Sequence, residues 1–247
     1  MKMTDLSRPA AGQSLTAPLS LALSNLDLLC ASVEENLQET VQETRRNVLR
    51  MYRAIRKYDL AEAIRTGKLR MDPEPYPAAG ILERVCTPLR GPAAERGVEL
   101  RTAAPPGLIA CCDAEAVGQV LWYLLENAVG AAQHGTRIEA AAERTEKGIR
   151  ISVDAAGLRF DDGRERIETA PNASGLGLSR DLLRMQGSTL ECLSREDGHA
   201  MVFVLPEGEC GALRCPVPAS PAVFGISEAE LELSVLKSAK IRNESSD

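Results

Sequence analysis

The chain of 247 residues is 44% hydrophobic and 26% charged, which is enough apolar content for one large or two modest folded domains. Its formal net charge of −6 argues against broad binding to DNA or RNA, whose phosphates are neutralised by clustered Lys and Arg. No apolar run is long enough to cross a bilayer, and the start of the chain lacks the apolar region of a signal peptide, so we expect a cytoplasmic protein without membrane contact. The seven cysteines are scattered without a Cys-x-x-Cys pair, which favours reduced thiols over disulfides or a zinc site.

Residues 1–70 are expected to form a helical hairpin. Their apolar residues recur in alternating steps of four and three, which is typical of a helix packed in a bundle. These residues are Leu15, Leu19, Ala22, Leu26, Leu29 and Val33, followed by Leu37, Val41, Thr44, Val48, Tyr52 and Ile55. We place the turn between the two helices at residues 31–36. Two amphipathic helices cannot bury their apolar stripe alone, so we expect a homodimer that pairs two hairpins into a four-helix bundle.

The second helix of this hairpin carries a basic stretch over residues 45–57, preceded by glutamates over residues 34–43. One interpretation is a solvated helix face with intrahelical ion pairs. The other is a docking surface for an acidic partner.

A proline-rich connector at residues 71–77 predicts a domain boundary, with a second domain over residues 71–209 and a tail over residues 210–247. In the second domain, periodicity predicts helices over 79–89 and 114–132, and strands over 98–102, 137–141, 149–153, 189–193 and 201–205. Such a mixture indicates an α+β protein with an α/β sandwich, in which helices cover one face of a sheet. The tail is expected to be irregular apart from a short helix opened by a capping box at residues 227–230, and its simplest interpretation is a surface appendage.

Two glycines one residue apart, Gly175 and Gly177, follow Ser174 and precede a helix-like run. Glycine allows close approach of the backbone to a ligand, and a helix start offers free N–H groups, so this pattern suits a phosphate. An isolated pattern of this kind is more often a turn with a helix cap.

Further blocks, in a fixed order, surround this glycine stretch. Residues 59–69 resemble the end of the second helix of a bacterial sensor histidine kinase, and residues 96–100 and 113–115 resemble the start of its nucleotide domain. Residues 119–129 resemble its asparagine box, 174–178 its second glycine box and 203–206 its closing strand. The chain from Gln13 to Pro206 therefore resembles a histidine kinase catalytic core, a dimerising hairpin followed by an ATPase domain of the GHKL type (gyrase, Hsp90, kinase, MutL). The resemblance implies two-component signal transduction, with a response-regulator receiver domain or a partner kinase as the binding partner.

The position of the phosphoacceptor differs from the family pattern. In the family, a histidine lies five residues before the proline of the first helix, and Gln13 has this place before Pro18. A carboxamide nitrogen is not nucleophilic, because its lone pair is delocalised, so no catalytic residue is expected at Gln13. The two histidines of the chain, His134 and His199, both fall in the second domain and are not expected to substitute.

The implied binding site for ATP and Mg²⁺ is also incomplete. The resemblance assigns Asn127 to the metal and the phosphates, and a buried carboxamide oxygen is a suitable ligand for Mg²⁺. It assigns Ser174, Gly175 and Gly177 to the phosphates. One turn before Asn127, however, Tyr123 replaces the small polar residue or glutamate of the family.

The first glycine box, which contains Gly157, carries a further substitution. An ungapped alignment places Ala155 where the family has the aspartate that receives the adenine amino group, and a shift by one residue would bring Asp154 into that role. Loss of a hydrogen bond to a charged acceptor costs about 1.5–3 kcal/mol, which weakens adenine recognition about tenfold to a hundredfold. ATP binding is therefore expected to be weak or lost.

Two hypotheses follow. The first is a degenerate kinase, a dimeric pseudokinase that acts as a scaffold or regulator by docking a response regulator or a partner kinase. The second is a divergent ATP-binding histidine kinase or phosphotransfer protein that uses Asn127, Gly175 and Gly177, with Asp154 at the adenine. A protein-serine kinase or anti-sigma type on the same nucleotide fold is a third reading, against which the long hairpin speaks.

Overall fold

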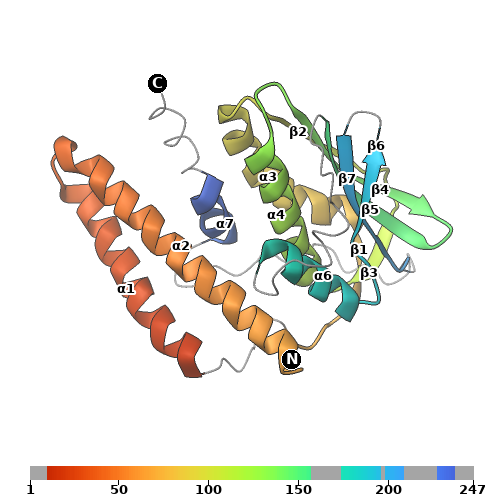
Figure 1. Ribbon diagram of the computed structural model, residues 1–247, viewed down its shortest axis with the longest axis horizontal. Coiled ribbons are helices and arrows are strands. Elements are labelled where there is room, and N and C mark those ends of the chain that lie inside the picture. The colour runs from red at the N-terminus through yellow and green to blue at the C-terminus, as the bar shows by residue number, and fades with distance from the viewer. Residues whose placement is uncertain (1–9, 157–173, 196–197, 209–226, 237–247) are drawn as a thin grey trace.

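The computed structural model describes residues 10–156, 174–195, 198–208 and 227–236. Its first two helices, α1 (Ala10–Ser32) and α2 (Glu35–Arg65), form a long hairpin that projects from the rest of the molecule (Figure 1). The turn between them falls at residues 33–34, inside the predicted interval. None of the described helices combines the length and the apolar content that crossing a membrane requires.

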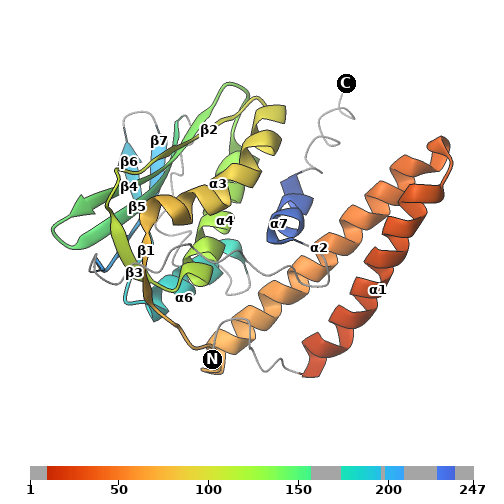
Figure 2. The same ribbon diagram turned by 180° about the vertical axis from the view of Figure 1, so that it is seen from behind.

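The second part of the chain is a sheet covered by helices on one face (Figures 1 and 2). Three helices lie on this face: α3 (Ala78–Glu95), α4 (Ala114–Ala131) and α6 (Gly175–Met185). The sheet has the order β2 (Glu99–Ala103), β4 (Arg137–Thr145), β5 (Gly148–Ala156), β7 (Gly198–Leu205) and β6 (Glu191–Arg195). Strand β2 is parallel to β4, and the other pairs are antiparallel. The α+β class and the sandwich expected from the sequence are confirmed.

A second, small sheet was not predicted. It pairs β1 (Glu74–Pro77) with β3 (Ile109–Cys112) in antiparallel register, Tyr76 opposite Ala110. Strand β1 lies inside the proline-rich connector, which sequence patterns indicate as non-helical but not as paired. Prolines are tolerated there because the two-stranded sheet leaves one edge of β1 without a ladder partner.

The main core lies between the large sheet and its helices. Along β5, Ile149, Ile151, Val153 and Ala155 alternate onto the face that meets α4, as the period of two in a strand requires. Helix α4 is buried over most of its circumference, because the sheet covers one side and α6, α3 and α7 pack against the others. It begins at Asp113, whose side chain accepts a hydrogen bond of 3.0 Å from the Ala116 amide.

A smaller, separate core lies within the hairpin. It consists of Leu23 from α1, Val48, Leu49 and Tyr52 from α2, and Leu231 from α7 (Glu228–Leu236). The apolar residues of α2 that were predicted to form the dimer contact therefore fall into two groups. Val48 and Tyr52 are buried within the same chain, whereas Leu37 and Thr44, nearer the tip, are exposed.

The interpretation of the tail helix as a surface appendage is wrong. Leu231, Glu232 and Ser234 are each less than 5% exposed, and α7 lies between the hairpin and the sheet-bearing part (Figure 2). The capping box itself is confirmed in part, since the Glu230 amide donates to Ser227 Oγ over 3.1 Å. The sequence of a nine-residue helix is too short to indicate which other elements will cover that helix.

Two buried tyrosines allow a matched test of this packing. Tyr52 is 1% exposed and its hydroxyl has no hydrogen-bond partner among the described residues, whereas the Tyr76 hydroxyl donates to Glu74 over 3.0 Å. Removing an unsatisfied buried hydroxyl relieves a desolvation cost, so we expect Tyr52→Phe to leave the free energy of unfolding unchanged or to raise it by about 1 kcal/mol. Tyr76→Phe should lower it by about 1 kcal/mol. Urea denaturation checks both values, and a Tyr52→Phe variant less stable than Tyr76→Phe would contradict the packing described.

Candidate functional site

The implied phosphate site lies at the start of α6. Ser174 is the N-cap of this helix, and its hydroxyl accepts a hydrogen bond of 3.0 Å from the Gly177 amide. The Ser174 carbonyl accepts a second bond from the Leu178 amide. Two of the predicted residues, Ser174 and Gly177, are thus joined in an ordinary helix cap, and the Gly177 N–H is already used.

Gly175 packs directly against Tyr123 of α4. A Cβ atom placed on Gly175 would lie 3.3 Å from both Cβ and Cγ of Tyr123, which is closer than most such contacts. Tyr123 is only 2% exposed. The glycine therefore lets the start of α6 approach the tyrosine, and the aromatic side chain occupies the space between α4 and α6.

Two cations of α2 face the Tyr123 ring. Lys57 Nζ lies 4.6 Å from the ring centroid, and the Arg53 guanidinium carbon lies 5.9 Å from it, both within the range of cation–π contacts. Burial raises the pKa of the Tyr123 hydroxyl, which therefore stays neutral. Burial also lowers the pKa of Lys57, and the neighbouring Arg53 lowers it further. Tyr123 is thus enclosed by α6 on one side and by the hairpin on another.

Asn127 lies one turn after Tyr123 on α4, as predicted, but the expectation of a buried carboxamide is wrong. The side chain is exposed, although most residues of α4 are buried. It makes no hydrogen bond with other described residues. Nor do the described parts of the chain contain a group of three or more His, Cys, Asp or Glu side chains able to hold a metal ion.

The adenine position falls on β5. Ala155 is 3% exposed and lies on the helix-facing side of the sheet, directly opposite His199 of β7. Asp154 is opposite Ala200 and Glu139, so its side chain alternates to the other face of the sheet. Gly157 lies outside the described residues. The residue of β5 that faces the helices is therefore Ala155, the residue that the ungapped alignment places at the adenine position.

Gln13 lies in the first turn of α1. His134 is an exposed residue between α4 and β4, and His199 is in β7, so neither histidine belongs to the hairpin. As expected, the sequence offers no imidazole on α1 or α2.

A buried ion-pair cluster was missed by the sequence analysis. Arg53 of α2, itself 6% exposed, forms ion pairs with Glu126 of α4 and with Glu232 of α7, the latter at 2.5 Å. Burial by itself lowers the pKa of Arg53, but the carboxylates of Glu232 and Glu126 outweigh this effect, and the pKa is raised. The basic stretch of α2, which contains Arg53, was the only part of this cluster that the sequence indicated. Its acidic partners are 73 and 179 residues away in the chain, where no local pattern connects them.

The fold has many counterparts among solved structures. Full-length ShkA in complex with AMPPNP superposes with a TM-score of 0.68 at 18% identity, covering 89% of this chain and 48% of that protein. The histidine kinase AdeS of Acinetobacter baumannii gives 0.57 at 12% identity, with 77% and 96% of the two chains covered. The histidine kinase ThkA, in complex with the response regulator TrrA, gives 0.55 at 15% identity, with 79% and 61% covered.

No protein-family model matches the sequence, and no curated protein matches it either. The chain spans about half the length of ShkA. At these levels of identity the likeness concerns the fold alone. It includes both the hairpin and the sheet-bearing part, because the alignments to ShkA, AdeS and ThkA extend over more than three quarters of this chain. The chain therefore has the fold of a histidine kinase catalytic core, a helical hairpin followed by a GHKL-type ATPase domain.

Proposed function

We propose that this chain is a degenerate histidine kinase, a dimeric scaffold or regulator in two-component signalling that does not transfer phosphoryl groups itself. One observation carries the proposal: the Tyr123 side chain is buried between α4 and α6, against Gly175, at the place that the family resemblance assigns to the nucleotide phosphates. Because the Tyr123 side chain lies beside Gly175, where a Cβ atom would already be crowded, it competes with phosphates for the approach to that glycine.

The donor set for ATP and Mg²⁺ does not fit either. An adenine amino group needs a hydrogen-bond acceptor, and the helix-facing residue at the end of β5 is the apolar Ala155. Mg²⁺ prefers several oxygen ligands, and exposed Asn127 is the single candidate that the resemblance supplies. With Gln13 in place of the phosphoacceptor, three separate chemical requirements of the kinase reaction are unmet while the fold is kept.

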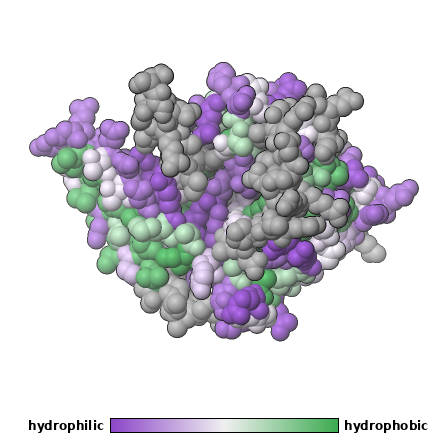
Figure 3. Space-filling view, in the orientation of Figure 1, coloured by the Kyte–Doolittle hydropathy of each residue, from purple (hydrophilic) through white to green (hydrophobic). Residues whose placement is uncertain are grey.

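Homodimerisation is supported by the exposed apolar surface of the hairpin. Leu21 and Leu28 of α1 are 63% and 70% exposed and lie seven residues apart, and Leu37, Met51 and Tyr58 of α2 are exposed at spacings of fourteen and seven. Figure 3 shows green surface gathered over the hairpin side of the molecule. Heptad spacing of exposed apolar residues is the pattern by which helices pair, so a second hairpin is the proposed cover.

A response-regulator receiver domain or a partner kinase is the proposed binding partner. The support is the complex of ThkA with the response regulator TrrA, since ThkA shares the hairpin and the ATPase domain with this chain. Docking needs a folded surface and no catalysis, so a chain without phosphoacceptor chemistry can retain it.

The proposed domain limits are 1–70 for the hairpin, 71–209 for the ATPase-like domain and 210–247 for the tail. The proposed location is the cytoplasm.

The alternative, a divergent ATP-binding kinase or phosphotransfer protein, draws on ShkA, whose structure contains AMPPNP. It requires Tyr123 to move away from Gly175 when the nucleotide binds. It also requires an adenine acceptor other than Ala155, such as Asp154 after a shift of the strand.

Calorimetric titration with AMPPNP and Mg²⁺ separates the two functions. We expect no saturable heat at millimolar nucleotide, and the same trace from Asn127→Ala and Gly175→Ala, because neither residue meets a nucleotide. Saturable binding that Asn127→Ala abolishes and Gly175→Ala weakens would favour the alternative instead.

Incubation with γ-labelled ATP and Mg²⁺ tests for the chemistry directly. We expect no acid-labile phosphate on the chain, because residue 13 has no nucleophilic nitrogen. The informative variant is Gln13→His, which restores an imidazole. Because the nucleotide site is also incomplete, we expect this variant to stay unlabelled by ATP, and labelling of either protein would contradict the proposal.

Light scattering tests the dimer. The wild-type chain should have twice the mass of one chain, and Leu21→Glu combined with Leu28→Glu should yield the monomer, because burying two carboxylates in an apolar seam is costly. The control Gln38→Glu changes an exposed polar residue of α2 and should leave the dimer intact. A wild-type monomer would refute the four-helix arrangement.

A further inference from the structure

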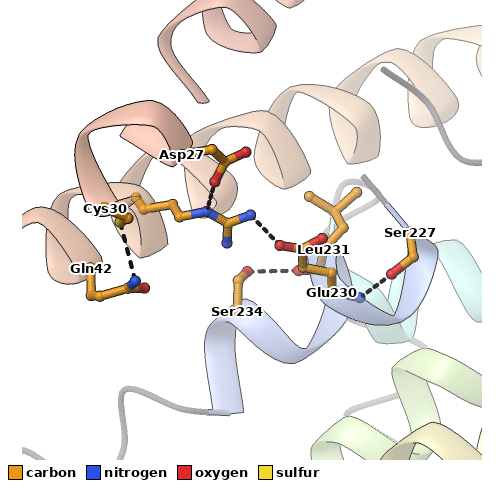
Figure 4. Close-up of polar contacts among 8 residues, drawn as sticks. Asp27, Cys30, Gln42, Ser227, Glu230, Leu231 and Ser234 are labelled. Carbon is orange, nitrogen blue, oxygen red and sulfur yellow. Dashed lines mark hydrogen bonds and ion pairs between the residues drawn. The ribbon is translucent and has the colours of Figure 1, made fainter. Parts of the chain in front are cut away.

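The basic stretch of α2 has an acidic partner inside the chain. Arg45 forms ion pairs with Asp27 of α1, at 2.6 Å, and with Glu230 of α7. Figure 4 shows dashed lines from Asp27, on α1, and from Glu230, on α7, to the same guanidinium. Further along α2, Arg50 Nε donates to the Ser234 carbonyl over 3.4 Å. The arginine side of α2 thus meets α7 from Glu230 to Ser234, over about one turn of the shorter helix.

Helix α7 is apolar on opposite sides, and each side belongs to a different core. Leu231 is 1% exposed and completes the hairpin cluster with Leu49 and Tyr52. Ala229 and Leu233, four residues apart and therefore on one face, pack against the core of the ATPase-like domain. A short helix with apolar residues on two faces is stable only when both are covered.

Glu232 connects the two parts through polar contacts. It is 4% exposed, with one oxygen paired to Arg53 of the hairpin and the other accepting a hydrogen bond of 3.3 Å from Gln119 of α4. Gln119 is also 4% exposed. A buried carboxylate with partners on both sides ties the hairpin to the ATPase-like domain.

We propose that α7 is an intramolecular strap: it occupies the arginine face of α2 and fixes the ATPase-like domain against the hairpin. The acidic partner for which the basic stretch is suited is therefore the chain's own tail helix. While α7 is in place, Arg45 and Arg53 are engaged and are not available to an external acidic protein. Release of α7 would free this face and leave the contacts of α2 with α6, the ion pair of Arg53 with Glu126 and the connector at residues 66–73 to hold the two parts.

Hydrogen exchange with mass spectrometry tests the strap in the full-length chain. Glu232→Gln keeps the shape of the side chain but removes the charge that pairs with Arg53. We expect amide exchange in α7 and in residues 45–57 of α2 to accelerate about tenfold or more, because the buried Arg53 loses one of its two carboxylates. The matched control is Glu228→Gln, a loss of charge on the same helix at a residue without an ion pair to the described residues, which should change exchange by less than about twofold.

A second variant keeps the proposal falsifiable if α7 still docks without its charge. A chain that ends at residue 226 should show the same faster exchange over residues 45–57, while protection in β5 and β7 stays at its wild-type level. Unchanged exchange in α2 in both variants would show that α7 does not hold this face and would overturn the proposal. Loss of protection in β5 and β7 as well would also overturn it, because α7 would then be part of the folding core and not a strap.

Discussion

The buried guanidinium of Arg53 constrains the arrangement of this molecule more than any other single group. A charge taken out of water is costly unless it is paired and hydrogen-bonded, so α2 can lie against the ATPase-like domain only where carboxylates meet it. Glu126 of α4 and Glu232 of α7 supply them. That requirement fixes which face of α2 turns inward, and the same face brings Lys57 over the Tyr123 ring. Removing one carboxylate would leave a buried charge half compensated, whereas replacing the whole cluster by apolar groups would not.

The substituted residues at the positions that the family resemblance assigns to a nucleotide form one packing arrangement. Exposing the apolar ring of Tyr123 to water in an open pocket would be unfavourable. Here its side chain is enclosed by Gly175, Lys57 and Arg53. Gly175, which the family resemblance assigns to phosphate, serves instead to let a helix start approach an aromatic side chain. Ser174 completes the helix by capping it. Under the proposed function, residues that resemble a ligand-binding motif have structural roles in this chain.

Much of the fold could be predicted from the sequence, because its signals are local. The alternation in β5, the periodicity of α4, the cap at Asp113 and the absence of Gly and Pro between Leu19 and Thr66 each depend on neighbouring residues. The exposure of Asn127 and the choice between Ala155 and Asp154 could not be settled from the sequence, because each depends on which face of its helix or strand the residue occupies. The role of Glu232 could not be predicted at all, since its partners Arg53 and Gln119 are more than 110 residues away. Val48 and Tyr52 carry the spacing of a dimer seam, yet Leu231 of the same chain covers part of it.

The proposed function depends on the Tyr123 side chain, which fills the place that the family resemblance assigns to the nucleotide phosphates. Nuclear magnetic resonance tests it at single residues, by following the amide signals of Leu176 and Gly177 while AMPPNP and Mg²⁺ are added to the wild-type chain. We predict that these signals stay where they are up to millimolar nucleotide, because the ring lies against the start of α6 and the Gly177 amide is bonded to Ser174. Saturable shifts of these two amides, accompanied by shifts of the Tyr123 ring protons, would show that the ring moves aside for a nucleotide and would contradict the claim.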